Sequence, residues 1–577
     1  MIVYRLLLLV LYVSTGFLLG CVPCVIRRKY GCFVASFVLC LWFAPALSWM
    51  YYSPLSACSP RIIHSLPANK SDDAVWESFW CSRPCTGRVM RPETHADLLS
   101  ILRTTPHVRA VGAGHSTSDL QCSDDTVLSL DALCYMETLT SHITRFGAGC
   151  TVLDAQTHLA SLGRQLMGYG SITTQRIGGA ISTSLHGQHT RQFADHVVAL
   201  TVALANGTMT RIEGVEVDAW LGSMGMLGVI VDVDLTTHPL EFVVCQRHVG
   251  NETHLYDALV DPTLAGFEAR VMFSGDDFQS FVIRTCRRIS NGTVNRTTTL
   301  TSLDDPFQAF VYDNVLLDWA LFLGAAVPHL PGIDDAILAS SPADTTVSGE
   351  TVATVNDYRL PVRFHPHFDE EYAVPNTHCS RLMRQIATEC IDDGMNAFFY
   401  IRRVDAARGW LTWSSTASCA VRVEFFRFTL DGVDVETRSR RCIEARVVGL
   451  GGSGHFGKPW FSSPHDMLLN SPQRQDFITY RNTLDPNGTF MTPYTRSLLH
   501  NVTYDRPPVL PPSLDTRLLV WRVLVGFNLV VTVVLSVFLC MDVSRTSRTT
   551  PPIVVTTTAA VKTPVPPRDS SIRRSRI

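Results

Sequence analysis

The sequence predicts an α+β protein with apolar segments at both ends. Short strands and helices alternate irregularly through the middle of the chain, which favours an α+β arrangement over a doubly wound parallel sheet. Two long apolar runs open the chain, at residues 6–26 and 32–51, and a third lies at residues 518–541. The 577 residues are enough for two or three folded units.

The charge balance excludes one class of function. The chain has 49 basic and 52 acidic residues, so it lacks the excess of positive charge that binding to nucleic acid requires. We therefore expect no nucleic-acid partner.

Each apolar run is long enough to cross a bilayer, which takes about 20 residues. Basic residues 27–29 separate the first two runs, and an Arg-, Thr- and Pro-rich tail follows the third at residues 542–577. Basic segments stay in the cytoplasm. We therefore expect a membrane hairpin at 1–51, a transmembrane helix at 518–541 and a disordered cytoplasmic tail. A signal peptide or signal anchor is the alternative for the first run.

This topology places the middle of the chain in the lumen of the endoplasmic reticulum and secretory pathway, or outside the cell. Asn-x-Ser/Thr sequons agree with it, since all of them lie between the apolar runs. They begin at Asn69, Asn206, Asn251, Asn291, Asn295, Asn487 and Asn501. The simpler interpretation of Asn206-Gly and Asn487-Gly is a turn. Twelve of the 17 cysteines lie outside the apolar runs and could pair in an oxidising compartment, although the sequence does not give their connectivity.

The expected elements follow in order along the chain. In the first half they are a helix at 94–102 capped by Thr94, a strand at 108–112, a helix at 153–162, a hairpin of 197–205 with 208–212, and a strand at 227–235. In the second half they are a helix at 378–390, strands at 396–404, 419–430 and 444–450, and a helix at 474–483.

Three glycine-rich stretches interrupt these elements. The first reads Gly112, Ala113, Gly114, His115, Ser116 and directly follows a strand. The second contains Gly178, Gly179, Ser182, Thr183, His186 and Gly187, and the third runs from Gly225 to Gly228, Val229 and Ile230. Glycines let a backbone approach a ligand closely, and successive amides cradle a pyrophosphate. A plain glycine turn remains the alternative for each stretch taken alone.

As an ordered set, these stretches resemble the FAD domain of vanillyl-alcohol-oxidase-type flavoproteins, and the one around His115 is similar to the aldonolactone oxidases. That family includes gulonolactone oxidase and D-arabinono-1,4-lactone oxidase. The resemblance implies a two-subdomain (PCMH-type) FAD-binding domain at residues 76–240 and an α+β substrate domain at 241–505.

The second half carries two further family segments. Residues 454–458, Gly-His-Phe-Gly-Lys, resemble the His-Trp-x-Lys segment of the family, and residues 480–490 resemble its terminal Arg-x-x-x-Asp-Pro-x-Gly-x-Phe motif. The resemblance implies that His115 bonds covalently to the flavin and that Lys458 lies in the substrate cavity. There a cation stabilises developing negative charge.

The strand around Tyr400 and Arg402 matches the family strand that presents Glu-x-Arg to the substrate. Arg402 keeps the arginine, but Tyr400 occupies the glutamate position, and a neutral phenol accepts hydrogen bonds from sugar hydroxyls less strongly than a carboxylate. Ala148 aligns with a small residue beside the flavin that influences oxygen access, without deciding between oxidase and dehydrogenase.

Other candidate residues are weaker. His365 and His367 lack a suitably spaced third metal ligand, and no metal is expected. His186 and His189 are better explained by the flavin loop, His455 by packing or hydrogen bonding, and Asp485-Pro486 by a turn.

The resulting expectation is an FAD-dependent oxidase of aldono-1,4-lactones that passes electrons to O₂, giving H₂O₂, on an ascorbate-like route. A sugar-alcohol or other carbohydrate oxidase with the same site is the first alternative. The second is a non-catalytic membrane glycoprotein on a flavin fold, which Tyr400 and the many sequons motivate.

Overall fold

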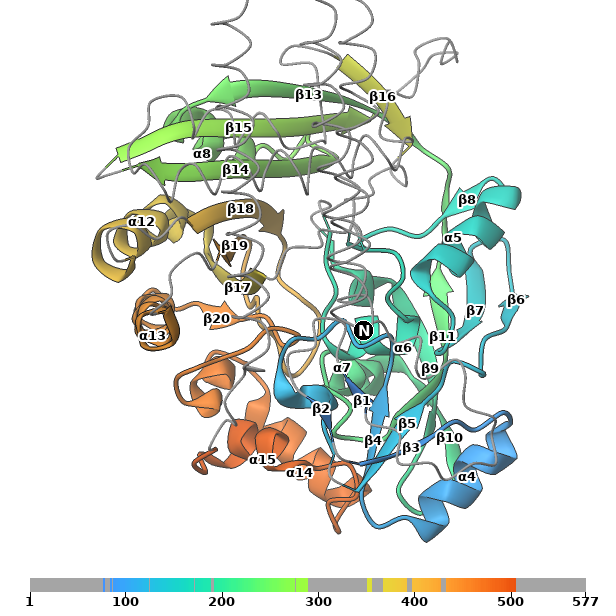
Figure 1. The fold of residues 1–577 in the computed structure, drawn as a ribbon. Helices are drawn as coiled ribbons and strands as arrows, with labels where there is room; N and C mark the ends of the chain where they lie inside the picture. Colours follow the sequence, from blue (N-terminus) through green and yellow to red (C-terminus); the bar gives the residue numbers. More distant parts are fainter. Residues whose placement is uncertain are drawn as a thin grey trace, which may run out of the picture. The chain divides into compact units, whose positions relative to one another are not determined.

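The computed structural model describes residues 76–77, 84–85, 87–123, 125–170, 172–187, 191–274, 277–288, 350–354, 367–391, 397–426 and 432–504 (Figure 1). The three apolar runs and the basic tail lie outside these ranges, as do the sequons at Asn69, Asn291 and Asn295 and the residues His189 and His365, whereas His367 begins a described strand. Across the described ranges, no helix is both long enough and apolar enough for a membrane span. The expected membrane segments therefore stay predictions.

A small parallel sheet begins the fold, with strand order β3-β5-β4. Its strands are β3 (Arg88–Met90), β4 (Val108–Val111) and β5 (Thr126–Ser129). Helix α4 (His95–Thr104) connects β3 to β4 and begins at the expected cap, where Thr94 Oγ1 accepts from the amide of Asp97 at 3.2 Å. Because the strands are parallel, they end at the same edge, and the loop that contains His115 leaves β4 there.

A five-stranded antiparallel sheet follows, in the order β10-β9-β11-β7-β6. Its strands are β6 (Met136–Thr138), β7 (Ile143–Gly147), β9 (Val197–Ala203), β10 (Met209–Glu213) and β11 (Val229–Thr236). The short strands β8 (Arg164–Gln165) and β12 (His238–Pro239) pair separately. Helix α5 (Val152–Ser161) follows β7, and helix α6 (Ile177–Ser182) contacts both β7 and β11.

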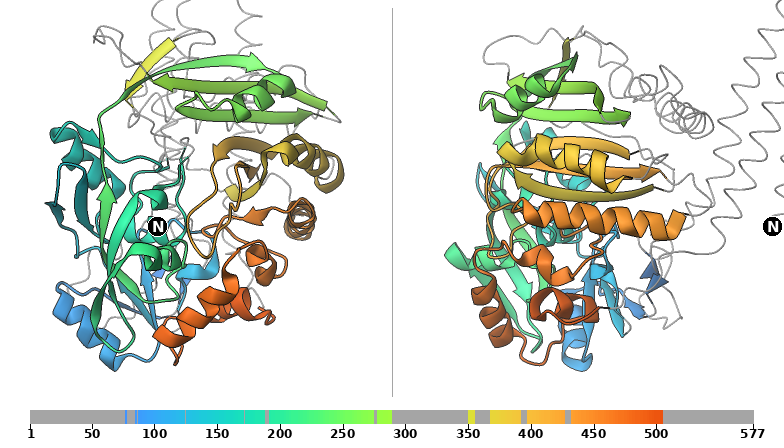
Figure 2. Two further views of the ribbon diagram at one scale, coloured as in Figure 1. Left: turned by 180° about the vertical axis from the view of Figure 1, so that it is seen from behind. Right: turned by 90° about the vertical axis from the view of Figure 1, so that its left-hand side faces the viewer.

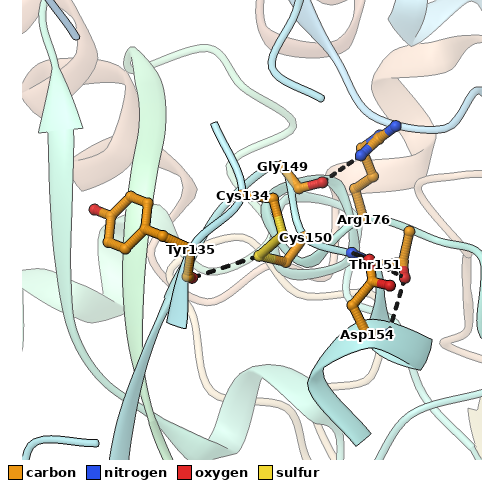
Figure 3. The surroundings of a disulfide bond; sticks show 7 residues. All are labelled: Cys134, Tyr135, Gly149, Cys150, Thr151, Asp154 and Arg176. Atoms are coloured by element: carbon orange, nitrogen blue, oxygen red, sulfur yellow. Dashed lines mark hydrogen bonds between the residues drawn. A yellow bond between two sulfur atoms is a disulfide. The ribbon is translucent and has the colours of Figure 1, made fainter. Parts of the chain in front are cut away.

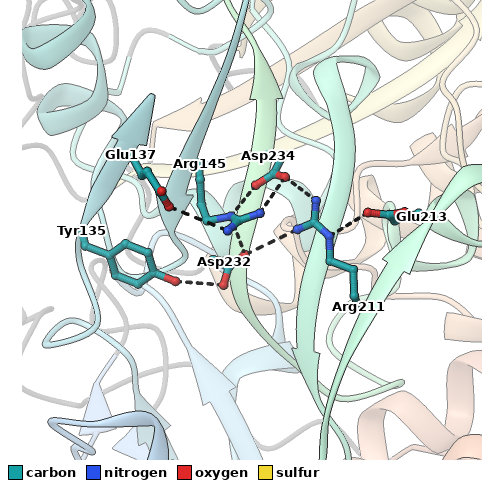
Figure 4. A network of polar contacts seen from close by, with 7 residues as sticks. All are labelled: Tyr135, Glu137, Arg145, Arg211, Glu213, Asp232 and Asp234. Atoms are coloured by element: carbon teal, nitrogen blue, oxygen red, sulfur yellow. Dashed lines mark hydrogen bonds and ion pairs between the residues drawn. The ribbon is translucent and has the colours of Figure 1, made fainter. Parts of the chain in front are cut away.

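An ion-pair network crosses one face of this sheet (Figure 4). Arg145 on β7 binds Asp234 on β11 through two hydrogen bonds, Nε to Oδ1 at 2.7 Å and Nη2 to Oδ2 at 3.1 Å. Arg211 on β10 also binds Asp234, and Tyr135 donates to Asp232 at 2.8 Å. The network connects the outer strands to the central strand β11.

The second half of the described chain forms an eight-stranded antiparallel sheet in the order β16-β13-β15-β14-β18-β19-β17-β20. The strands are β13 (Phe242–Gly250), β14 (Gly266–Ser274), β15 (Asp277–Arg288), β16 (Glu350–Thr354), β17 (His367–Pro375), β18 (Ala397–Val404), β19 (Ser418–Phe426) and β20 (Ser453–Gly454). Helix α8 (Glu252–Val260) contacts β13, β14 and β15.

The two faces of this sheet differ in character. On one face the register aligns Ala269, Ile401, Val421 and Tyr372, and all four are buried. Helix α13 (Gly432–Gly449) covers this face, because Arg440 on the helix pairs with Glu370 on β17. The opposite face carries Arg and Glu side chains, and it is the face that carries the site.

One disulfide bonds a helix to the sheet, and a second bonds the turn after that helix to α13. Cys379 of α12 (Cys379–Gln385) bonds Cys419 on β19, and Cys390 bonds Cys442 on α13. The two helices run beside the strands in the side view of Figure 2. These bonds agree with the expectation that cysteines in the middle of the chain pair.

The last helices return to the N-terminal half (Figure 1). They are α14 (Arg474–Leu484) and α15 (Pro493–His500). The Val108 amide donates to the Thr489 carbonyl at 2.9 Å, and the Tyr504 hydroxyl donates to Asp119 at 2.8 Å. Asp485 is fully buried and accepts from the amides of Thr489 and Phe490, so it closes a turn as expected.

Most expected elements are present within a few residues of their predicted bounds, but the strand expected at 444–450 is wrong. Residues 444–449 complete helix α13. Val447 and Val448 favoured a strand, yet Ile443 and Val447 lie four residues apart, the helical spacing, and both are fully buried. The helix expected at 378–390 begins as α12 and ends in a π-helical turn, Ile386–Cys390.

Candidate active site

The first two glycine-rich stretches meet backbone to backbone. A Cβ on Gly178 would lie 2.9 Å from Cβ of Ala148, and a Cβ on Gly179 would lie 3.9 Å from Cα of Gly112. The amide of Gly178 donates to the carbonyl of Ala148 at 3.0 Å. The β4 loop, the β7–α5 loop and the start of α6 therefore pack without intervening side chains, which leaves backbone surface for a flat ligand.

A disulfide holds the β7–α5 loop in this position (Figure 3). Cys150 bonds Cys134, and Arg176 donates to the carbonyl of Gly149. Thr151 and Asp154 then cap α5 reciprocally. Ala148 and Gly149 are thus held between a covalent link and the half-buried guanidinium of Arg176.

Several expected cofactor residues serve the local fold. Ser182 Oγ donates to the Gly178 carbonyl at 2.8 Å, and Thr183 Oγ1 donates to the Gly179 carbonyl at 3.0 Å. A Cβ on Gly187 would lie 2.0 Å from the Tyr169 carbonyl oxygen. The third glycine stretch supports packing, since a Cβ on Gly228 would lie 3.0 Å from the Trp220 ring. Val229 and Ile230 are buried strand residues of β11.

His115 follows Gly114, whose positive φ of 71° favours glycine. Its Nε2 lies 3.0 Å from Thr174 Oγ1. Burial, together with the charge of Lys458, lowers the pKa of His115 to about 4. The imidazole is therefore neutral at physiological pH, and neutral imidazole is its nucleophilic form.

The segment that contains Lys458 docks directly on the His115 loop. The Thr117 amide donates to the Gly457 carbonyl at 2.8 Å, and Ser118 Oγ donates to the Phe456 carbonyl at 3.2 Å. Phe456 is fully buried. Two sequence motifs about 340 positions apart therefore form one surface, with Lys458 half-buried at its edge.

Three buried polar side chains, His186, Glu371 and His455, lie where the loop after α6 meets the eight-stranded sheet. His186 Nε2 lies 3.1 Å from Glu371 Oε1, and the rings of His186 and His455 are 5.5 Å apart. Trp413 packs against both imidazoles, at 4.7 and 4.9 Å between ring centroids. Burial raises the pKa of Glu371, but the contact with His186 and the positive charge of Arg402 outweigh it and hold that pKa well below its ordinary value.

Tyr400 and Arg402 lie on the charged face of the eight-stranded sheet. The register aligns Arg270, Tyr400, Arg422 and Glu371 in one row across four strands. The guanidinium carbons of Arg270 and Arg422 lie 5.3 and 5.6 Å from the Tyr400 ring centroid. Arg402, in the next row, has its Nε 3.8 Å from Glu268. Tyr400 and Arg402 are therefore part of a wider charged surface of the sheet.

Sequence reasoning missed Glu371, whereas it assigned His455 to packing or hydrogen bonding, and the structure shows both for that residue. Residues 368–371 read Phe-Asp-Glu-Glu, and the sequence predicts no site residue there. Only the pairing of β17 with β19 and β20 puts Glu371 beside His186 and His455. A buried carboxylate in a register row of arginines is a three-dimensional signal that spacing along the chain does not contain.

Comparison with known proteins gives two successive family matches. Residues 87–213 match an FAD binding domain, and residues 267–498 match the D-arabinono-1,4-lactone oxidase family. An L-gulono-1,4-lactone dehydrogenase of Mycobacterium tuberculosis is 24% identical, over 74% of this chain and 99% of its own. An L-gulonolactone oxidase of Bos taurus is 22% identical, over 68% of this chain and 90% of its own. A D-arabinono-1,4-lactone oxidase of Eremothecium gossypii is 27% identical, but the match covers only 32% of this chain and 37% of that protein.

Solved structures show the same fold at greater distance. A cholesterol oxidase from B. sterolicum superposes with a TM-score of 0.59 at 13% identity, covering 75% of this chain and 99% of the other. A solvent-stable cholesterol oxidase gives a TM-score of 0.60 at 15% identity. The family match and the fold thus agree on a PCMH-type FAD-binding fold with a mixed helix-and-sheet second half. The expected relationship to the FAD-linked aldonolactone oxidases is confirmed.

Proposed function

We propose that this chain oxidises aldono-1,4-lactones at a carbinol carbon, with FAD as the cofactor and O₂ as the electron acceptor, on an ascorbate-like route. The observation that carries the proposal is the docking of the Lys458 segment on the His115 loop. This contact brings the glycine-rich motif around His115, expected to bind the cofactor, against the motif that contains Lys458, expected to bind the substrate. Relatives named as oxidases and as a dehydrogenase both match, so the choice of O₂ is the finer part of the proposal.

The residues of the cradle fit FAD. Gly112, Gly178 and Gly179 present backbone without side chains, and Ala148 stands against Gly178 with only a methyl group. A bound flavin supplies hydride and oxygen chemistry. Neutral His115 has the protonation state that covalent attachment to the flavin needs, and we propose that it makes this bond.

The chain's own residues then position and polarise the substrate. Lys458 and Arg402 are donors without acceptor capacity, so they bind lactone oxygens and stabilise negative charge on the reacting hydroxyl. Tyr400, held between two guanidinium groups, contributes a hydroxyl in place of the usual carboxylate. The ring packing of Trp413 on the histidines excludes water from this side of the site.

We further propose that the apolar runs at 6–26, 32–51 and 518–541 anchor the enzyme, with its folded part in the lumen or outside the cell. Disulfides of the described chain support an oxidising compartment. Asn206, Asn251, Asn487 and Asn501 are all exposed, as glycan acceptors must be. Peptide-N-glycosidase treatment of the secretory-pathway protein should lower its mass on a gel, and an unchanged mass would count against this topology.

A polyol or other carbohydrate oxidase remains the alternative activity, because the charged face around Tyr400 departs from the family pattern. The assay is direct. Purified full-length protein is denatured to see whether flavin stays attached, and peroxide is then followed with gulono-, galactono- and arabinono-lactones and with alditols. Lactone-dependent peroxide supports the proposal. Flavin without turnover on any of these compounds would favour a non-catalytic glycoprotein.

A further inference from the structure

The expected site residues provide cations but no acceptor for a proton. Oxidation of a carbinol removes a hydride from carbon and a proton from the hydroxyl oxygen. Lys458 and Arg402 donate hydrogen bonds and do not accept protons, and Tyr400 is a neutral phenol between two guanidinium groups. Under the proposed function, the reaction therefore needs a further residue to take the hydroxyl proton.

His186 has the geometry of such a residue. Its side chain is only 3% exposed, and its Nε2 faces Glu371 Oε1 at 3.1 Å. An ionised carboxylate only accepts hydrogen bonds, so Nε2 carries the hydrogen and Nδ1 carries the lone pair. Within the described residues, buried Nδ1 of His186 has no hydrogen-bond partner. A ligand hydroxyl that donates to Nδ1 would satisfy this buried acceptor.

A metal site is the competing interpretation of the same cluster. Ligand atoms of His186, Glu371 and His455 lie within 4.8 Å of one another. However, Nδ1 of His455 accepts from the Gly457 amide at 3.1 Å, and its Nε2 lies 3.3 Å from the Ser184 carbonyl. Both ring nitrogens are thus engaged with the backbone, which leaves two ligands, too few for a structural or catalytic metal site.

We propose that the His186–Glu371 pair is the catalytic base of this site. Nδ1 of His186 takes the proton of the substrate hydroxyl as the hydride passes from carbon to the flavin. The O–H and C–H bonds break, an N–H bond and a carbonyl form, and the flavin gains two electrons. The Glu371 carboxylate balances the charge of the resulting imidazolium. The pair connects the loop after α6 to strand β17 of the eight-stranded sheet, whose charged face also carries Tyr400 and Arg402.

The charged surroundings agree with this role. Glu371 on β17 faces His186 at 3.1 Å, and His455 comes from the segment after β20. Lys458 adds positive charge beside His455, and Arg402 on β18 adds it beside Glu371. Burial lowers the pKa of His455 to about 3 despite the nearby carboxylate of Glu371, so His455 stays neutral. The charge of Glu371 is therefore available to His186.

His186→Gln in the full-length flavoprotein tests the proposal. The glutamine amide can still donate to Glu371 but has no acceptor at the position of Nδ1. We expect unchanged flavin content and an anaerobic rate of flavin reduction by lactone about 100-fold to 10 000-fold lower. His238→Gln is the control, because His238 lies on β12 and contacts His196 instead. A rate within about twofold of wild type, or loss of the flavin itself, would overturn the proposal.

Glu371→Gln provides the second variant. It should move the acid limb of the reduction rate to lower pH, because the neutral amide no longer stabilises the protonated base. A readout without turnover is the fluorescence of Trp413, which a protonated imidazole quenches. Its acid-induced quenching should be lost in His186→Gln and absent from Trp413→Phe. An unmoved acid limb, or a stoichiometric transition metal in the purified protein, would refute the base assignment.

Flavin reduction by lactone in wild type and in His186→Gln distinguishes an error in the proposed function from an error in the assignment of the base. If no lactone or alditol reduces the wild-type flavin, the proposed function is wrong. If a lactone reduces wild type and His186→Gln equally fast, the function stands and the base is wrong.

Discussion

Asp234→Asn should destabilise the N-terminal half of the protein by about 2–3 kcal/mol. The Asp234 side chain is 3% exposed and accepts from two arginines, with the Arg145 Nε bond at 2.7 Å (Figure 4). Removing one partner of a buried ion pair costs about 3–5 kcal/mol. Arg145 and Arg211 are 27% and 34% exposed, so water solvates the released cations in part and reduces the loss.

The pH dependence of this effect follows from the same contacts. Burial raises the pKa of Asp234, but hydrogen bonds from Arg145 and Arg211 outweigh it and lower the pKa overall. A group whose pKa is depressed by folding stabilises the protein above its unfolded value, about 3.9. That stabilisation is lost as the pH falls through the folded pKa. The difference between wild type and variant should therefore be full at neutral pH and shrink below about pH 4.

The assay is urea unfolding followed by circular dichroism at several pH values, with stability taken from the midpoint and slope. Glu213→Gln is the matched control. Glu213 binds Arg211 in the same network, but its side chain is 67% exposed, so its loss should cost at most about 0.5 kcal/mol. Equal stability of Asp234→Asn and wild type at neutral pH, or a difference that persists undiminished in acid, would refute the reasoning.

Three further predictions concern the cofactor cradle. Gly178→Ala should lower the flavin content of the purified protein, because the new Cβ would lie 2.9 Å from Cβ of Ala148. The control Gly449→Ala should retain the flavin, since no atom lies within 4 Å of its new methyl group. Equal flavin content in the two variants would contradict a role of Gly178 in binding the cofactor. Cys134→Ser should lower the free energy of unfolding by about 3 kcal/mol, the value for a cross-link of this loop length. A reducing agent should lower the free energy of unfolding less in this variant than in wild type. An unchanged free energy of unfolding in the variant would show that the disulfide does not hold the loop. His115→Ala should release flavin on denaturation while retaining some non-covalent binding in the native state, and flavin that stayed attached would disprove the linkage.

The local features of the cradle were predictable from the sequence because they depend on neighbours along the chain. Thr94 caps α4 through Asp97, three residues away. Gly178 and Gly179 predict that another segment of backbone packs closely against them. Only the structure shows that these segments are the ones containing Ala148 and Gly112. The strand expected at 444–450 failed because β-branched residues in a short window outweighed the helical spacing of Ile443 and Val447.

The chemistry of the substrate side was less predictable, because strand register determines it. Tyr400 was identified as a departure from the family pattern, but its two flanking arginines come from β14 and β19. Glu371 gave no signal in the sequence, since its partner His186 is 185 positions away and joins it only when the two halves pack. A buried carboxylate that faces the flavin loop is visible only in three dimensions.

Oxidation of an aldonolactone by a bound flavin can be followed directly in the flavin spectrum. The most direct test is to add gulono-, galactono- or arabinono-1,4-lactone to the purified full-length protein without oxygen and to record the flavin spectrum. We predict that at least one lactone bleaches the oxidised flavin band and that admitting air restores it with formation of peroxide. A flavin spectrum that no lactone changes would contradict the account.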